Sequence, residues 1–243
     1  MSAHYLALEI RRVLRSPRFM IFTVAFPVLL FLLYTGIFVK DGDGAGTASL
    51  MVNMTAFGAM ASGLFTGTRV AIERQAGWQR QLRLTPLSGS GYLVAKAATG
   101  MILALAPVIL VPLTGLIVKG VSLDAAGWLR VTVGVWLAAV PFALIGLLIG
   151  QIGTADSTQP ITQLVMLPMA LVGGIFIPID VMPQWLLNIA HVLPAYWLAQ
   201  VGRGGVTTDH ATGLGQDALV LGLFTVVLSI AVIRRYRKDS ARV

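Results

Sequence analysis

Six stretches of the chain are almost continuously apolar, and polar or charged segments separate them. Each approaches the ~20 residues that an α-helix needs to cross about 30 Å of hydrocarbon at 1.5 Å per residue. The pattern therefore predicts an all-α integral membrane protein with six transmembrane helices, at residues 19–39, 50–68, 92–118, 128–150, 160–178 and 216–233. Because no long hydrophilic segment separates them, we expect a single transmembrane domain over residues 1–243.

Two further segments have helical amphipathic spacing but are too short to span a bilayer. In Tyr5–Arg15, apolar residues recur on one side and arginines lie on the other, which predicts a helix on the membrane surface. Pro183 is suited to the first turn of a helix, and an apolar stripe runs from Trp185 to Leu193, where Pro194 ends it. This second pattern predicts an extracellular interfacial or re-entrant helix over residues 183–194, between the fifth and sixth spans.

The cations are distributed unevenly between the two sides of the predicted membrane. Fourteen of the 18 lysines and arginines lie on one side: in the N-terminal segment, around the loop after the second span, and in the C-terminal tail. Excess Lys and Arg marks cytoplasmic loops, so we predict that both termini are cytoplasmic. We expect the first span to be a retained signal anchor, because it is too long for a signal peptide and no small-residue cleavage site follows it.

The composition agrees with a membrane location. Only 12% of residues are charged, against about 25% in soluble proteins, and the mean hydropathy is +0.82. This leaves too little polar surface for a soluble enzyme or a nucleic-acid-binding protein, so we attribute the net charge of +8 to the loops beside the membrane. The absence of cysteine excludes disulfides and thiolate chemistry.

Other classes of membrane protein fit the sequence less well. An ion-coupled carrier is the alternative, although such carriers need ionisable groups at membrane depth and the predicted spans have none near their middles. An intramembrane enzyme is disfavoured because all three histidines lie outside the spans, and we predict no catalytic residue. The GxxxxGK[ST] phosphate-binding motif is also missing, so we expect neither ATPase activity nor a bound cofactor or metal in this chain.

Small residues and methionines in the spans point to packing. The pairs Gly63-x-x-x-Gly67 and Gly146-x-x-x-Gly150 have the spacing of close helix contacts, although this does not identify a seam between two chains. Met166 lies one turn from Met169, which favours core packing over metal binding because no His or Cys joins the pair.

The predicted cytoplasmic loop after the second span has the features of a docking site. A short charged helix should follow Arg69 and stop at Pro86, with a break near Gly77 because glycine weakens a helix by ~1 kcal/mol relative to alanine. Trp and Arg anchor protein interfaces more often than other residues, so Trp78 among arginines is typical of a partner-binding surface. A solvated loop whose arginines only fix the topology is equally compatible with the sequence.

Two motifs stand in order on opposite sides of the predicted membrane. The first comprises Glu73-Arg74, Gly77, Leu82, Thr85-Pro86-Leu87, Tyr92 and Lys96. The second comprises Gly173-Gly174, Phe176, Pro178, Met182-Pro183, Trp185 and Leu193-Pro194. With these motifs the chain resembles the permease subunits of ABC-2-type ATP-binding-cassette exporters, of the daunorubicin-resistance type. Trp78 departs from that family, which more often has a small polar residue there, and this puts the choice of partner in doubt.

The resemblance implies a mechanism in which the cytoplasmic loop is a coupling helix seated on a separate ATPase subunit. That subunit would bind ATP and Mg, and two permeases, identical or related, would form a dimer in the plasma membrane. The implied cargo is an amphipathic drug, antibiotic or lipid, whose efflux would give antibiotic resistance. The implied coupling residues are Glu73, Arg74, Gly77, Trp78, Arg80, Leu82 and Arg83. The implied outer gate contains Pro178, Pro183 and Trp185.

Overall fold

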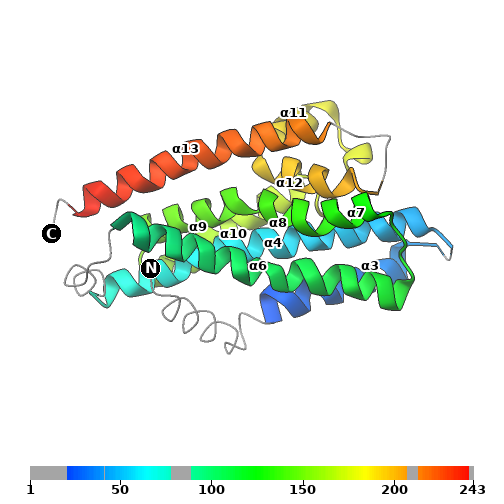
Figure 1. Ribbon diagram of the computed structural model, residues 1–243, viewed down its shortest axis with the longest axis horizontal. Coiled ribbons are helices and arrows are strands. Elements are labelled where there is room, and N and C mark those ends of the chain that lie inside the picture. The colour runs from blue at the N-terminus through cyan, green and yellow to red at the C-terminus, as the bar shows by residue number, and fades with distance from the viewer. Residues whose placement is uncertain (1–20, 41, 78–88, 207–212, 241–243) are drawn as a thin grey trace.

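The computed structural model describes residues 21–40, 42–77, 89–206 and 213–240, and within these ranges the chain is all-helical, without strands (Figure 1). The elements are η1 (Ile21–Ala25), α3 (Phe26–Phe38), α4 (Gly44–Gln75), α6 (Gly89–Lys119), α7 (Ala125–Leu129), η2 (Arg130–Gly134), α8 (Val135–Ala138), α9 (Val140–Ile152), α10 (Ala155–Val172), η3 (Ile179–Val181), α11 (Gln184–His191), α12 (Pro194–Arg203) and α13 (Leu214–Ser240). The predicted surface helix at Tyr5–Arg15 lies outside the described residues.

Helical structure occupies each of the six predicted spans within the described residues. Four helical segments are long and apolar enough to cross a membrane, namely α4, most of α6, the run from α7 to α9, and α13 up to Lys238. The first predicted span contains a shorter apolar helix, Thr23–Phe38, and the fifth overlaps the 18-residue α10, whose first half is polar and which begins before the predicted span. These helices are those of a membrane protein, while the count of six spans and the cytoplasmic location of the termini stay predictions.

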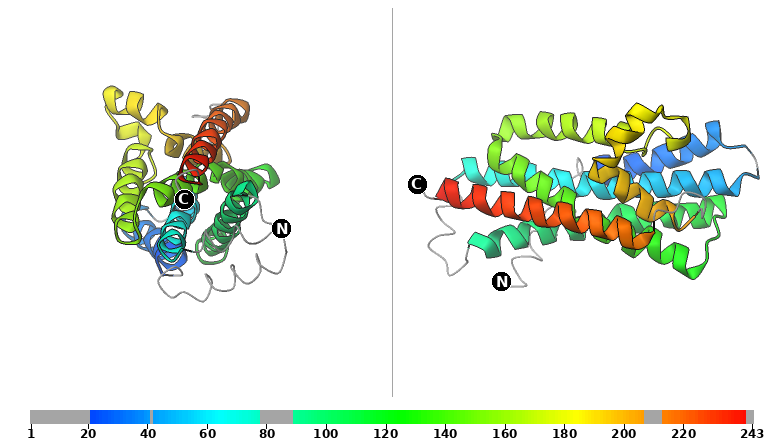
Figure 2. Two further views of the ribbon diagram at one scale, coloured as in Figure 1. Left: turned by 90° about the vertical axis from the view of Figure 1, so that its left-hand side faces the viewer. Right: turned by 90° about the horizontal axis from the view of Figure 1, so that it is seen from above.

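The helix α4 forms the centre of the bundle, and α3, α6, α9, α10 and α12 pack against it (Figure 2). Every residue from Met51 to Leu64 is buried. This part of the helix carries small and apolar residues on all of its faces, which is the pattern of a helix enclosed by other helices. The centre of the protein is therefore a spanning helix that faces protein more than lipid.

Close contact between α4 and α9 explains the two small-residue motifs. A Cβ atom on Gly67 would overlap the carbonyl oxygen of Gly146, and one on Gly150 would overlap the carbonyl oxygen of Gly67. A Cβ atom on Gly63 would lie 2.7 Å from the backbone nitrogen of Ala143, again too close. The two motifs therefore meet each other within one chain, as close-packed membrane helices do.

Charged residues separate to the two ends of the bundle. We call the end where α4 and α13 stop the basic end; it carries Arg69, Arg74, Arg234, Arg235, Arg237 and Lys238 (Figure 1). We call the other the mixed-charge end; it carries Lys40, Asp43, Lys119, Asp124, Arg130, Asp180, Arg203 and Asp217. These are the sets that the sequence places on opposite sides of the membrane.

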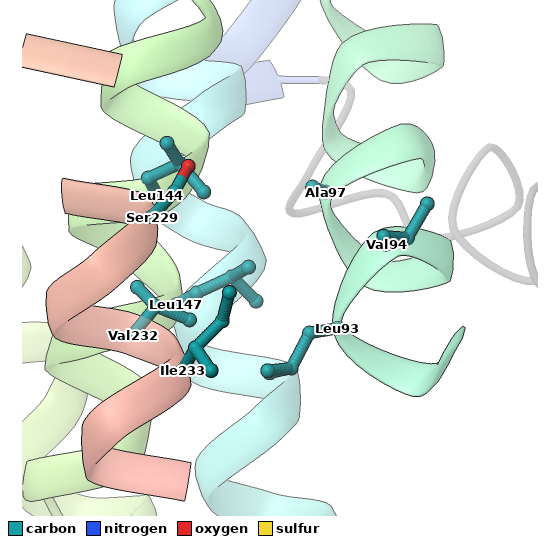
Figure 3. Close-up of a pocket in the computed structure, with 8 residues that line it drawn as sticks. All are labelled: Leu93, Val94, Ala97, Leu144, Leu147, Ser229, Val232 and Ile233. Atoms are coloured by element: carbon teal, nitrogen blue, oxygen red, sulfur yellow. The ribbon is translucent and has the colours of Figure 1, made fainter. Parts of the chain in front are cut away.

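The last helix, α13, lies against α9 and α12 and leaves a crevice on its side facing α6. Figure 3 shows this crevice, which has a volume of about 110 Å³ and an almost wholly apolar lining from α6, α9 and α13. Leu219, Leu223 and Val226 on α13 are exposed. An apolar, exposed face on a long helix is typical of contact with lipid or with a second membrane chain.

The region between α10 and α13 departs from the prediction at both ends. The helix α10 stops at Val172 instead of Pro178, because Gly174 adopts a φ of +78°, a left-handed backbone that ends a helix. The helix α11 covers eight residues and stops at His191, so it is shorter than predicted.

Pro194 begins the next helix instead of ending the previous one. Proline lacks a backbone N–H, which the first turn of a helix does not need. The helix that it starts, α12, is buried along its whole length and was not predicted as an element.

Candidate coupling site and outer segment

Glu73 connects the last turns of α4 to the first turns of α6. Its Oε1 atom lies 2.6 Å from Nζ of Lys96, and its Oε2 atom accepts a hydrogen bond of 2.8 Å from the hydroxyl of Tyr92. Lys96 is only 1% exposed and Glu73 22% exposed, so the ion pair is shielded from water. Tyr92, Lys96 and Glu73 belong to the motif that carries the family resemblance, and the structure brings the three together.

Arg74, the next residue, connects α4 to α9. Its guanidinium donates hydrogen bonds to the carbonyl oxygens of Gly150, at 3.1 Å, and Gln151. Both carbonyls belong to the last turn of α9, where backbone oxygens have no partner within the helix and a positive charge is stabilised by the helix dipole. Arg74 therefore closes the end of α9, and we call Glu73 with Arg74, and their partners on α6 and α9, the clamp.

Gly77 ends α4 directly after the clamp. Its φ of +70° lies in the left-handed region that glycine adopts at little cost, and its N–H donates to the carbonyl of Arg74 at 3.1 Å. The break that the sequence predicts near Gly77 is confirmed. The helix itself reaches Gln75, seven residues beyond the predicted span, so Glu73 and Arg74 lie on the spanning helix and not on a separate helix.

The remaining predicted coupling residues, Trp78, Arg80, Leu82 and Arg83, lie outside the described residues. In the sequence, these residues come after the end of α4 and before the start of α6. The rings of Tyr92 and Tyr236, with centroids 6.3 Å apart, bring α13 to the same place. The basic end therefore brings α4, α6, α9 and α13 together around the end of α4 and the start of α6.

The outer segment, residues 173–193, contains the three predicted gate residues. Pro178 precedes η3, Pro183 caps the start of α11, and Trp185 is 65% exposed on α11. The segment is attached to the bundle core through the ring of Phe176, which lies 4.9 Å from that of Phe57 on α4. The three gate residues lie along one surface segment at the mixed-charge end, and Trp185 projects away from the core.

The family follows from comparison with known proteins. The sequence matches the ABC-2 type transporter family over residues 5–206, most of the chain. The chain belongs to the ABC-2 type transporter family. It is also 29% identical over 208 residues to YvfS of Bacillus subtilis (strain 168), a candidate transport permease by its name, with 82% of this chain and 84% of that protein covered.

As an ABC-2 type transporter, the chain is a membrane transport permease rather than an ATPase, and its family implies a partner ATPase of the ABC type. The sequence assigns Lys96 to the basic loops, whereas the structure places its side chain among the most buried in the ABC-2 permease. Sequence analysis also gives no role to Asn53 or Arg203, which are both buried. The only sequence signal for Lys96 is its spacing from Glu73 in the motif.

Proposed function

We propose that this permease is the transmembrane subunit of an ATP-driven exporter of the daunorubicin-resistance type. The permease would lie in the plasma membrane with its basic end facing the cytoplasm, since clustered Lys and Arg stay on that side. A separate ATPase subunit, which binds ATP and Mg, would dock on the segment between α4 and α6. Two permease chains, identical or related, would enclose the path of an amphipathic drug, antibiotic or lipid.

The clamp is the observation that carries this proposal. A push by an ATPase on the segment between α4 and α6 does work on the transport path only if the base of that segment is fixed to the spanning helices. Glu73 fixes it to α6 through the 2.6 Å contact with Lys96, and Arg74 fixes it to the last turn of α9. A force on the segment would thus move three spanning helices together.

The outer segment would act as the gate on the far side. Trp185 is an exposed aromatic residue on an amphipathic helix, and such residues are favoured at the boundary between lipid and water. The contact between Phe176 and Phe57 links this segment to α4, whose other end carries the clamp. One helix would therefore connect the ATPase end to the proposed gate.

Docking is tested by replacing arginines of the segment between α4 and α6 with alanine. We expect Arg80→Ala with Arg83→Ala to leave the permease folded in the membrane but to reduce co-purification of its ATPase and cargo-stimulated ATP hydrolysis by at least about tenfold, the loss typical of interface arginines. The matched control is Arg234→Ala with Lys238→Ala, which removes two exposed cations from the same end. Full ATPase binding and export by the first variant would refute docking on this segment.

The same reconstituted system separates the exporter from an ion-coupled carrier. In vesicles, export by the permease with its ATPase should require ATP and should stop with a non-hydrolysable analogue. Transport by the permease alone, driven by a proton or sodium gradient without nucleotide, would refute the exporter and favour the carrier.

A further inference from the structure

A cavity of about 360 Å³ lies at the mixed-charge end, opposite the clamp. Its wall comes from the end of α3, the first turns of α4, the η3 segment and the end of α12. Phe38, Leu50 and Ile179 give it an apolar part, while Asn53, Asp180 and Arg203 give it a polar part. This volume is at the lower end of the range for small-molecule sites in proteins.

The guanidinium of Arg203 has an unused pair of donors at this cavity. The side chain is 8% exposed, and neither Nε nor Nη2 has a hydrogen-bond partner among the described residues. The Nε–H bond and one Nη2–H bond lie parallel on one edge of the planar guanidinium, and together they form the fork that binds a carboxylate or phosphate through two parallel hydrogen bonds. A buried donor without a partner is costly, so this fork requires an acceptor.

The charge of Arg203 persists in its buried position. Loss of hydration lowers the pKa of Arg203 to about 10, and the carboxylates of Asp180 and Asp217 act in the opposite direction. The group is therefore protonated at pH 7. The backbone at Gly174 makes room for it, because a Cβ atom there would lie 3.2 Å from both Nη atoms.

Asn53 supplies a second unused polar group on the same wall. Its side chain is 7% exposed and its Oδ1 atom, an acceptor, has no hydrogen-bond partner among the described residues. Asp43 and Asp180 also line the cavity, so the charged lining residues within the described part of the chain sum to −1 with Arg203 included. The site therefore offers a fork for an oxyanion next to acceptors for a cationic N–H donor, and an anion alone would meet net negative charge.

We propose that this cavity binds the zwitterionic group of an amphipathic molecule, with its phosphate or carboxylate on the fork of Arg203 and its ammonium towards Asn53 and Asp180. The apolar lining holds the start of the hydrocarbon part, next to the exposed, apolar end of α3 at Ile37 and Phe38. An aminophospholipid headgroup and a water-soluble zwitterionic amphiphile share this chemistry. The idea that this group belongs to a transported cargo rests on the proposed export function. The binding of a zwitterionic group in the cavity does not depend on it.

The test is a titration of the full-length purified permease in detergent micelles, without nucleotide or ATPase. The probes are twelve-carbon phosphatidylethanolamine, phosphatidylcholine and phosphatidylglycerol, and binding is followed by native mass spectrometry and by the rise in thermal midpoint. We expect phosphatidylethanolamine to bind at least about tenfold more tightly than the other two, because phosphatidylcholine lacks an N–H donor and phosphatidylglycerol lacks a cation. Equal binding of all three lipids would overturn the proposal.

Two variants locate the binding. Arg203→Lys keeps the charge but loses the fork, and should weaken phosphatidylethanolamine binding by about tenfold to a hundredfold. Asn53→Leu removes the unused acceptor with little change in size, so it should weaken binding while the lipid-free protein stays at least as stable as the wild type. The control is Arg234→Lys, the same substitution at an exposed arginine of the basic end, which does not line the cavity. Unchanged binding by both Arg203→Lys and Asn53→Leu would overturn the proposal.

The source of the ligand is distinguished with free phosphoethanolamine. Binding of the free headgroup with an affinity similar to that of the lipid supports a water-soluble cargo, and binding of the lipid alone supports a membrane lipid. A permease that binds the zwitterion but shows no ATP-dependent export would refute the proposed function and leave this site standing. A permease that exports its cargo with ATP but binds no zwitterion would refute this site and leave the proposed function standing.

Discussion

Replacing Glu73 with alanine should destabilise the permease more than replacing both Glu73 and Lys96. Lys96 is 1% exposed, and the variant would leave its ammonium buried without this carboxylate. Removing one partner of a buried ion pair typically costs about 3–5 kcal/mol, whereas replacing both partners with apolar groups is often nearly neutral. Tyr92 loses an acceptor in both variants, which adds about 1 kcal/mol to each.

These values give a definite order of stability. We expect Glu73→Ala to lower the free energy of unfolding by about 4–6 kcal/mol, and Glu73→Ala with Lys96→Met by about 1–2 kcal/mol. Tyr92→Phe, which removes one hydrogen bond and keeps the ion pair, should cost about 1 kcal/mol. The second substitution in the double variant therefore restores stability.

The measurement is equilibrium unfolding of each variant by sodium dodecyl sulfate in mixed micelles, followed by tryptophan fluorescence. The single variant Lys96→Met completes the comparison. A double variant as unstable as Glu73→Ala, or with a loss equal to the sum of the losses in Glu73→Ala and Lys96→Met, would show that the two side chains are not coupled and would refute this reasoning. If the exporter proposal is correct, the double variant should still bind the ATPase but hydrolyse ATP with weaker stimulation by cargo, because α4 and α6 are no longer joined.

Two glycines give further tests by the same unfolding measurement. Gly67→Ala should destabilise the permease by about 1–3 kcal/mol, because the new Cβ atom would overlap the Gly146 carbonyl, whereas Gly222→Ala, which meets open space on α13, should change stability by at most about 1 kcal/mol; equal effects would contradict the α4–α9 contact. Gly77→Ala should cost about 1–2 kcal/mol because of the left-handed backbone at φ +70°, and Gly77→Asn should cost less, since asparagine tolerates that region; an alanine variant as stable as the wild type would contradict the cap.

Hydropathy and charge predict the parts of this fold that respond to lipid. A run of apolar residues as long as that in α6 has no stable alternative to a helix in a bilayer, because every backbone group must find its partner internally. The separation of cations to one end is visible in the sequence for the same reason, since crossing the membrane is costly for each charge. Gly77 is also predictable, because its effect on the helix is local.

The residues that sequence analysis misses owe their environment to other helices. Residues 194–203 include Tyr196, Gln200 and Arg203 and are too few to span a bilayer, so hydropathy does not mark them as a span. They form a buried helix because neighbouring elements supply hydrogen-bond partners for it. Trp197 donates a hydrogen bond to the carbonyl of His191 on α11, and Arg130 on η2 donates to the carbonyl of Gly204 just beyond the helix. No pattern along the chain encodes these contacts.

The helix α4 connects the clamp to the cavity at the other end. Glu73 and Asn53 lie on the same helix, about 30 Å apart along its axis at 1.5 Å per residue. Between them, Gly63 and Gly67 bring the backbone of α4 into direct contact with α9, so at these glycines no flexible side chain separates the two helices to absorb a displacement. We therefore expect α4 and α9 to move as one rigid body, and relative motion during transport to occur at the looser contacts, such as the crevice between α6 and α13.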